Sequence, residues 1–222
     1  MEQRAISEEA YEALVKSIFP IILRKGMKAT TMDSVAAQLS MSKRTLYEIF
    51  ESKKGMLVAV ISYFHRQFHN RAVEIFNEAG SVIEAIYRIL QMHQQVMQQG
   101  HPDFFRDMDE NYKSLRHIYD EEQKNWNNDI VTILRMGMKQ GVFRKDVNYP
   151  VTIRLTRLQM ESLKRMEEFF PSDITMAEAF DAISVGFLRT IATAEGIAIL
   201  DRMRAEEPPG KLRVSCLEQG EE

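Results

Sequence analysis

The stretch GMKATTMDSVAAQLSMSKRTLYEIFESKKGML (residues 26–57) combines two short amphipathic segments with a cluster of cations around one tyrosine. Thr30 places a hydroxyl just before an apolar run, and Asp33 follows it at the spacing of a capping box. This pattern predicts a short helix that begins near Met32.

A second short helix is predicted over residues 43–50. The three residues from Ser40 to Ser42 form a break, and Ser42 is a favourable N-cap. Ser52 then caps a third helix, which begins at residue 53. Two short helices separated by a tight turn predict a helix-turn-helix.

The 43–50 helix has one apolar and one polar face. A helical projection places Leu46, Ile49 and Phe50 on the first and Arg44, Tyr47 and Glu48 on the second, flanked by Lys43 and Thr45. Its N-terminus carries a positive dipole end, which favours a phosphate nearby. Lys53 and Lys54, in the first turn of the next helix, are unfavourable for that helix's own dipole and therefore suggest an anionic partner.

This cationic surface predicts an interface with duplex DNA, in which Arg and Lys contact phosphates or guanine edges and hydroxyls contact the backbone. An ordinary amphipathic helix with a solvated face remains an alternative. In that case Arg44 simply pairs with Glu48 at the i, i+4 spacing.

The whole chain of 222 residues carries a formal charge of −3, but the charge is uneven. Residues 1–70 hold ten Lys and Arg against seven Asp and Glu, and the remainder holds nineteen against twenty-five. The N-terminus is charged, no run of eighteen apolar residues occurs, and there is a single cysteine, Cys216. We therefore expect a cytoplasmic protein with no membrane association, no internal disulfide and no metal site.

Apolar residues recur at three- and four-residue spacing nearly throughout, which predicts an all-α protein of about nine helices. Helices predicted between about residues 27 and 52 are short, whereas those predicted at 53–78, 112–140, 150–169 and 174–204 are long. This contrast predicts an N-terminal helix-turn-helix domain over residues 1–52, a helical bundle over 53–204, and a disordered tail over 205–222.

Residues 26–57 resemble the DNA-binding signature of the TetR family of bacterial transcriptional regulators. The match is carried by Gly26, Thr31, Val35-Ala36, Leu39, Ser42-Lys43, Thr45-Leu46-Tyr47, Phe50, Ser52-Lys53 and Met56-Leu57. The sequence departs from the family pattern at Ser40, where a glycine is usual, and at Ile49, where His or Tyr often contacts a phosphate.

The resemblance implies a homodimer that binds a palindromic operator on double-stranded DNA, and a helical domain that binds a small-molecule effector and relieves repression. Together with the projected polar face, it gives the predicted DNA-binding residues: Thr30, Thr31, Ser42, Lys43, Arg44, Thr45, Tyr47, Glu48, Lys53 and Lys54.

Two long C-terminal helices have faces that suit a second subunit. A small-residue stripe in 174–204, together with positions in 150–169, gives the predicted dimer interface: Ile153, Met160, Leu163, Ala179, Ala182, Gly186, Thr190 and Thr193. The same stripes are compatible with buried helices of a monomer.

An effector pocket is predicted in the central helices, which are rich in methionine and aromatic residues. The predicted lining residues are Met92, Met97, Phe104, Phe105, Met108, Glu122, Trp126, Ile130 and Met160. A simple hydrophobic core is the alternative for this stripe, and a solvent-facing position is the alternative for Glu122.

Catalytic motifs are absent from the sequence, so we expect no enzyme and no cofactor. His65 and His69 have the i, i+4 metal spacing, but Arg66 stands where a zinc protease motif needs its Glu. Two other functions remain open: a helical module whose helix-turn-helix binds protein, and a DNA binder that has no small-molecule ligand.

Overall fold

The computed structural model describes residues 6–110 and 130–206, with the backbone alone at 108–110. Within this part of the chain all regular structure is helical, apart from an isolated β-bridge between Phe143 and Ala192. The all-α prediction is confirmed. No described helix is long and apolar enough to cross a membrane.

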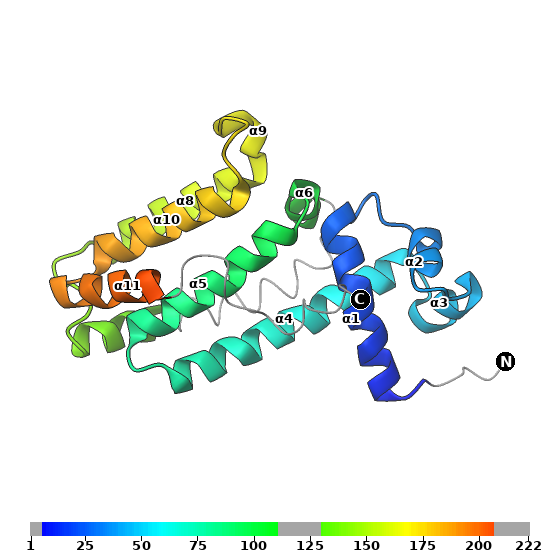
Figure 1. Ribbon diagram of the computed structural model, residues 1–222, viewed down its shortest axis with the longest axis horizontal. Helices are drawn as coiled ribbons and strands as arrows, with labels where there is room; N and C mark the ends of the chain where they lie inside the picture. The colour runs from blue at the N-terminus through cyan, green and yellow to red at the C-terminus, as the bar shows by residue number, and fades with distance from the viewer. Residues whose placement is uncertain (1–5, 111–129, 207–222) are drawn as a thin grey trace. The chain divides into compact units, whose positions relative to one another are not determined.

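Packing divides the described chain into two compact units (Figure 1). The first contains residues 6–70 and 100–110, and the second contains 71–99 and 130–206. The helix that begins at Lys53 passes from one unit to the other at Asn70. This division differs from the boundary predicted after residue 52, because residues 53–70 and 100–110 pack with the N-terminal helices.

The first unit contains five helical elements. They are α1 (Glu8–Lys25), α2 (Met32–Gln38), α3 (Lys43–Phe50), the first part of α4 (Lys53–Glu78) and α6 (Pro102–Glu110). Phe19 of α1 stacks on Phe64 of α4, with ring centroids 3.6 Å apart, and meets Phe104 of α6 edge to face at 6.1 Å. These aromatic contacts fix three helices around one core.

The second unit contains the remainder of the described helices. They are α5 (Val82–Gln99), residues 130–139, α8 (Tyr149–Ser162), the 3₁₀ turn Leu163–Arg165, α9 (Met166–Phe169), α10 (Met176–Ile191) and α11 (Ala194–Glu206). Helix α10 packs against both α5 and α8. The core includes Ile83, Tyr87, Phe143, Leu188 and Leu200.

Two predicted long helices are interrupted. The 150–169 segment changes to a 3₁₀ turn after Ser162, and the 174–204 segment breaks at Ala192 and Thr193. Thr193 donates its backbone N–H to Val142 and its hydroxyl to Gly141, at 3.0 and 2.7 Å. Its hydroxyl also caps α11 by accepting the N–H of Gly196. The break is therefore stabilised by a distant loop.

The helices of the helix-turn-helix, and the helix after it, begin close to the residues predicted from the sequence. The side chain of Ser42 accepts the N–H of Thr45 at 3.1 Å, and Ser52 accepts the N–H of Gly55 at 3.0 Å, as predicted. The capping box of α2 lies one residue later than predicted, because Thr31 pairs reciprocally with Ser34. The predicted pairing through Thr30 and Asp33 is wrong.

Ser40 adopts a backbone conformation that glycine accommodates better, with φ of 51°. A left-handed conformation costs a non-glycine residue roughly 1–2 kcal/mol. We expect Ser40→Gly to raise the free energy of unfolding by about 1 kcal/mol, measured by urea denaturation. Ala37→Gly, on the exposed face of α2, is the control and should lower that free energy by about 0.5–1 kcal/mol. An unchanged or lower stability of Ser40→Gly would contradict the prediction.

Candidate DNA interface

Helix α3 presents the face that the projection predicted. Leu46 and Phe50 are 0% and 5% exposed and anchor the helix, whereas Tyr47 on the opposite side is 49% exposed. The other exposed side chains of α3 are those of Lys43, Arg44 and Glu48, while Thr45 and Ile49 are half-buried. Helix α2 contacts α3, so the two form one helix-turn-helix (Figure 1).

The cations on this face have carboxylate partners within the same unit. Arg44 donates from Nε to Oε1 of Glu48 at 2.8 Å, and Lys43 pairs with Asp33 of α2. These four side chains are 42–76% exposed, so each pair contributes little to stability. The Arg44–Glu48 pair considered as an alternative does exist, and it lies on the exposed face beside Tyr47.

Thr30 does not lie on this surface, so its inclusion among the DNA-binding residues is wrong. Its side chain is fully buried, and its hydroxyl donates to the carbonyl of Gly26 at 2.7 Å. Thr31 is exposed instead and forms the N-cap of α2. Two adjacent threonines thus have different roles, one in the turn and one at the surface.

Lys53 and Lys54 differ in the same way. Lys54 is exposed, whereas Lys53 is half-buried and donates from Nζ to the carbonyl of Lys28 at 2.8 Å. Burial lowers the pKa of the Lys53 ammonium, and the charge of the Asp107 carboxylate partly offsets that effect. Its DNA-binding role was predicted from the helix dipole and from the family resemblance, and neither shows the contact with the turn at Lys28.

Lys28 is a cation of this region that the sequence prediction missed. It lies in the turn between α1 and α2, and its side chain is 55% exposed. A lysine three residues before a helix-capping threonine was the available signal. Lys28 also contacts Asp107 of α6. Asp107 lies three residues after Phe104, on the apolar side of that helix, and this position was a second signal in the sequence.

The residues predicted to line the effector pocket are distributed over both units. Phe104 packs with Phe19 and Phe105 in the first unit, and Ile130 packs against the core of the second. Met92 is buried, whereas Met97 and Met160 are half-buried. Glu122, Trp126 and the side chain of Met108 lie outside the described residues.

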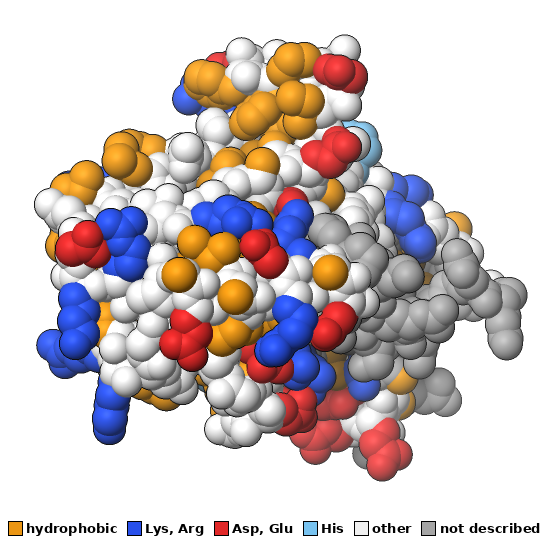
Figure 2. Space-filling view, turned by 60° about the vertical axis from the view of Figure 1, so that its left-hand side comes forward, with side chains coloured by type: hydrophobic (Ala, Val, Ile, Leu, Met, Phe, Trp, Pro, Cys, Tyr) orange, Lys and Arg blue, Asp and Glu red, His pale blue; other side chains and the backbone are white. Residues whose placement is uncertain are grey.

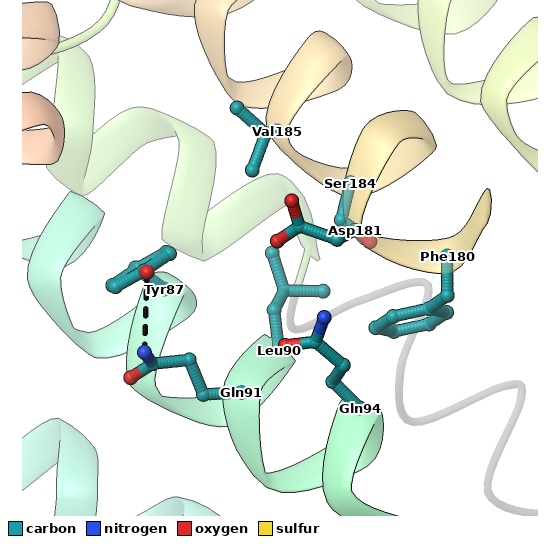
Figure 3. A pocket seen from close by; sticks show the side chains of 8 residues that line it. All are labelled: Tyr87, Leu90, Gln91, Gln94, Phe180, Asp181, Ser184 and Val185. Carbon is teal, nitrogen blue, oxygen red and sulfur yellow. Dashed lines mark hydrogen bonds between the residues drawn. The ribbon is translucent and has the colours of Figure 1, made fainter. Parts of the chain in front are cut away.

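A small cavity of about 10 Å³ lies between α5 and α10 (Figure 3). Its lining contains Tyr87, Leu90, Gln91, Gln94, Phe180, Asp181, Ser184 and Val185, and none of the residues predicted for the pocket. The phenol oxygen of Tyr87 accepts from Gln91 Nε2 at 3.1 Å, and Gln94 Nε2 donates to the carbonyl of Ala177 at 3.3 Å. The cavity is thus lined by hydrogen-bonding groups as well as apolar ones.

Five of the eight predicted dimer residues fall into two groups. Ala182, Gly186 and Thr190 of α10 are exposed, and a Cβ added at Gly186 would meet nothing within 4 Å. Leu163 and Ala179, each 4% exposed, are buried within their own chain, so their assignment to an exposed interface is wrong.

Three more predicted dimer residues have contacts within the chain or are partly covered. Ile153 packs against the core of the second unit, and Thr193 bonds to Gly141. Met160 is half-buried. Val151, Leu155 and Leu158 of α8, which the predicted interface does not include, are 50%, 57% and 61% exposed.

Residues 21–60, which span the helix-turn-helix, match the family described as bacterial regulatory proteins, tetR family. Over these residues the chain carries a TetR-family DNA-binding domain. The match covers the surface of α2 and α3 described above, and it makes the protein a DNA-binding transcriptional regulator. Within the described residues, no group of three or more His, Cys, Asp or Glu side chains could hold a metal ion.

Relatives of this chain are regulators as well. It is 25% identical over 141 residues to the transcriptional repressor KstR2 of Mycolicibacterium smegmatis, a match that covers 60% of this chain and 67% of KstR2. It is 33% identical over 78 residues to the transcriptional regulator YvaF of Bacillus subtilis, covering 35% of this chain and 40% of YvaF.

A solved structure extends the likeness of fold beyond the helix-turn-helix. A transcriptional regulator from Saccharomonospora viridis, in complex with choline, superposes with a TM-score of 0.66 at 18% identity. That match covers 84% of this chain and all of the S. viridis chain. The helical second unit is therefore part of the same overall fold.

Proposed function

We propose that this TetR-family regulator is a homodimeric repressor that binds a palindromic operator and is released by a small-molecule effector. The exposed face of α3 carries the proposal: Tyr47 and Arg44 project from a helix whose opposite side is buried. Such a helix can enter the major groove while its N-terminus and the neighbouring α2 contact phosphates. The repressor KstR2 supports this direction of regulation.

We propose that the dimer forms through an α8–α10 face, defined by Val151, Leu155 and Leu158 of α8 and by Ala182, Gly186 and Thr190 of α10. The first three lie at i, i+4 and i+7, so they share one side of their helix. Exposed large apolar side chains in a row are characteristic of interaction surfaces. The small residues of α10 would let a partner helix approach closely.

More hydrophobic side chains gather around α9, at the top of the space-filling view (Figure 2). Phe169 and Ile174 are 53% and 37% exposed there. An open groove of about 370 Å³ lies beside them, lined by Phe170, Ile174, Ala182 and others. Because Ala182 belongs to both surfaces, this groove extends the proposed α8–α10 face.

We propose that the effector binds in the second unit, at the α5–α10 cavity. A volume of about 10 Å³ holds at most one water, so an effector must displace side chains to enter. Ser184 is 3% exposed and its hydroxyl has no partner among the described residues. A buried polar group of this kind favours an effector that has a hydrogen-bonding group. The choline complex of the S. viridis regulator supports ligand binding in this fold.

Selection of sequences from a random duplex pool, followed by fluorescence anisotropy of the selected duplex at two salt concentrations, tests the proposal. We expect a two-fold symmetric consensus with half-sites about one helical turn, roughly 34–36 Å, or a multiple of it apart. Affinity should fall steeply as salt rises. Failure to enrich any sequence would instead favour a helix-turn-helix that binds protein.

Tyr47→Ala tests the role of the exposed tyrosine on α3. Because a phosphate contact carries no sequence information, we expect the variant to bind all duplexes more weakly and by a similar factor. Anisotropy with the selected operator and with a scrambled duplex measures both affinities. A change in base preference would contradict a phosphate contact and would assign Tyr47 to base recognition.

A further inference from the structure

Asp107 of α6 is a buried carboxylate that the proposed DNA interface does not use. The residue is 1% exposed, and a carboxylate that is removed from water requires compensating partners. Its Oδ2 accepts the backbone N–H of Lys28 at 2.8 Å, and its Oδ1 lies 3.5 Å from Nζ of the same lysine. Both oxygens of Asp107 are therefore directed at one residue of the α1–α2 turn.

Lys28 is held on its other side as well. Its carbonyl accepts the ammonium of Lys53, at the start of α4, at 2.8 Å. The N–H and the C=O of one residue thus connect α6 with the N-terminus of α4. Since Thr31, the N-cap of α2, follows three residues later, the position of Lys28 also constrains where α2 begins.

Two further contacts fix α6 against α1. The backbone N–H of His101 donates to the carbonyl of Leu23 at 2.9 Å, near the C-terminal end of α1. Phe104 meets Phe19 edge to face. A Cβ added to Gly26 would lie 3.1 Å from Cβ of Asp103, so the turn after α1 approaches α6 closely. Figure 1 shows α6 beside the upper end of α1.

We propose that Asp107 is a positioning residue for operator binding: it fixes the α1–α2 turn from α6 and thereby sets Lys53 and the N-terminus of α2 against the DNA backbone. This inference rests on the proposed DNA-binding function. A charge-assisted hydrogen bond to a backbone N–H is among the stronger protein hydrogen bonds, and its loss leaves a buried donor without an acceptor. The turn and the cation that it holds would then be free to move.

The test compares substitutions at Asp107 with a matched charge control on the same helix. D107A removes the acceptor, D107L removes it while filling the space, and D107N retains an acceptor without the charge. D103N is the control, because the Asp103 carboxylate pairs with Arg106 and is about two-fifths exposed. Circular dichroism and sedimentation verify that each variant keeps its helix content and oligomeric state.

Two readouts are measured: hydrogen exchange of the Lys28 amide by NMR, without DNA, and operator affinity by anisotropy. We expect D107A and D107L to exchange the Lys28 amide at least about tenfold faster and to bind the operator at least about tenfold more weakly. D107N should retain the slow exchange and stay within about threefold of the wild-type affinity, because an amide oxygen can still accept the hydrogen bond. D103N should match the wild type in both readouts.

The outcomes separate this inference from the proposed function. A wild-type protein that selects no duplex refutes the proposed function, whatever Asp107 does. A wild-type Lys28 amide that exchanges as fast as an unstructured one refutes the inference, even if no alanine or leucine variant folds. Wild-type operator binding by folded D107A or D107L also refutes it, as does an equal loss in D103N.

Discussion

Replacing Leu158 with glutamate is expected to convert the regulator to monomers and to abolish tight operator binding. Leu158 is 61% exposed on the proposed α8–α10 face, so the isolated chain should tolerate the change. In a two-fold symmetric dimer the carboxylate would appear twice, buried without a partner each time, at a cost of several kcal/mol. Operator affinity should fall by at least about 100-fold, because two linked DNA-binding units gain that much from binding together.

Sedimentation velocity and anisotropy measure the two effects of this substitution. Val73→Glu is the matched control: Val73 of α4 is 47% exposed and lies outside the proposed face, so this variant should remain dimeric and bind normally. A dimeric Leu158→Glu protein with full affinity would exclude α8 from the interface. A monomeric wild-type protein with strong symmetric operator binding would reject the dimer itself.

Arg44→Ala is expected to weaken operator binding by about 1–3 kcal/mol and to relax the preference at one base pair. Arg44 is 76% exposed on α3, and a guanidinium can contact a guanine at two atoms. In the free protein the same guanidinium pairs with Glu48 at 2.8 Å, so DNA must compete with that carboxylate. The loss should therefore be smaller than that of an arginine without a partner.

Glu48→Gln is the control for the Arg44 prediction. It removes the competing carboxylate and keeps the cation, so it should strengthen binding to the operator and to random duplex by similar factors, measured by anisotropy. Equal losses of Arg44→Ala on operator and random DNA would make Arg44 a phosphate contact. Weaker binding of Glu48→Gln would instead indicate that Glu48 contacts a base, since a carboxylate can accept from cytosine.

The helix-turn-helix was predictable because its determinants are local. Helix α3 has a serine N-cap and alternate burial of Leu46 and Tyr47 within eight residues, and both features are apparent from spacing alone. The exception is the choice between Thr30 and Thr31. Both offer the same hydroxyl in the sequence, and only the position of the Gly26 carbonyl decides which one is buried.

The body was less predictable because its determinants are distant in sequence. The break at Thr193 depends on backbone contacts with residues 141 and 142, about fifty positions away. Methionine and aromatic spacing indicates burial but not the partner, so Phe104 was assigned to a pocket although it packs against Phe19. Helix periodicity also could not show which side of α8 its own chain would cover.

Two ion pairs on the proposed DNA-binding surface bear on how this regulator would find its operator. Lys43 pairs with Asp33 and Arg44 pairs with Glu48, so these two cations already have carboxylate partners before DNA arrives. To bind DNA of any sequence, Lys43 and Arg44 must exchange these carboxylates for phosphates. They therefore gain less binding free energy than unpaired cations would. A genome offers about 10⁶–10⁹ competing sites, and a protein held weakly by each of them spends less time on the wrong ones. Low general affinity therefore shortens the search and leaves the specific contacts to determine occupancy.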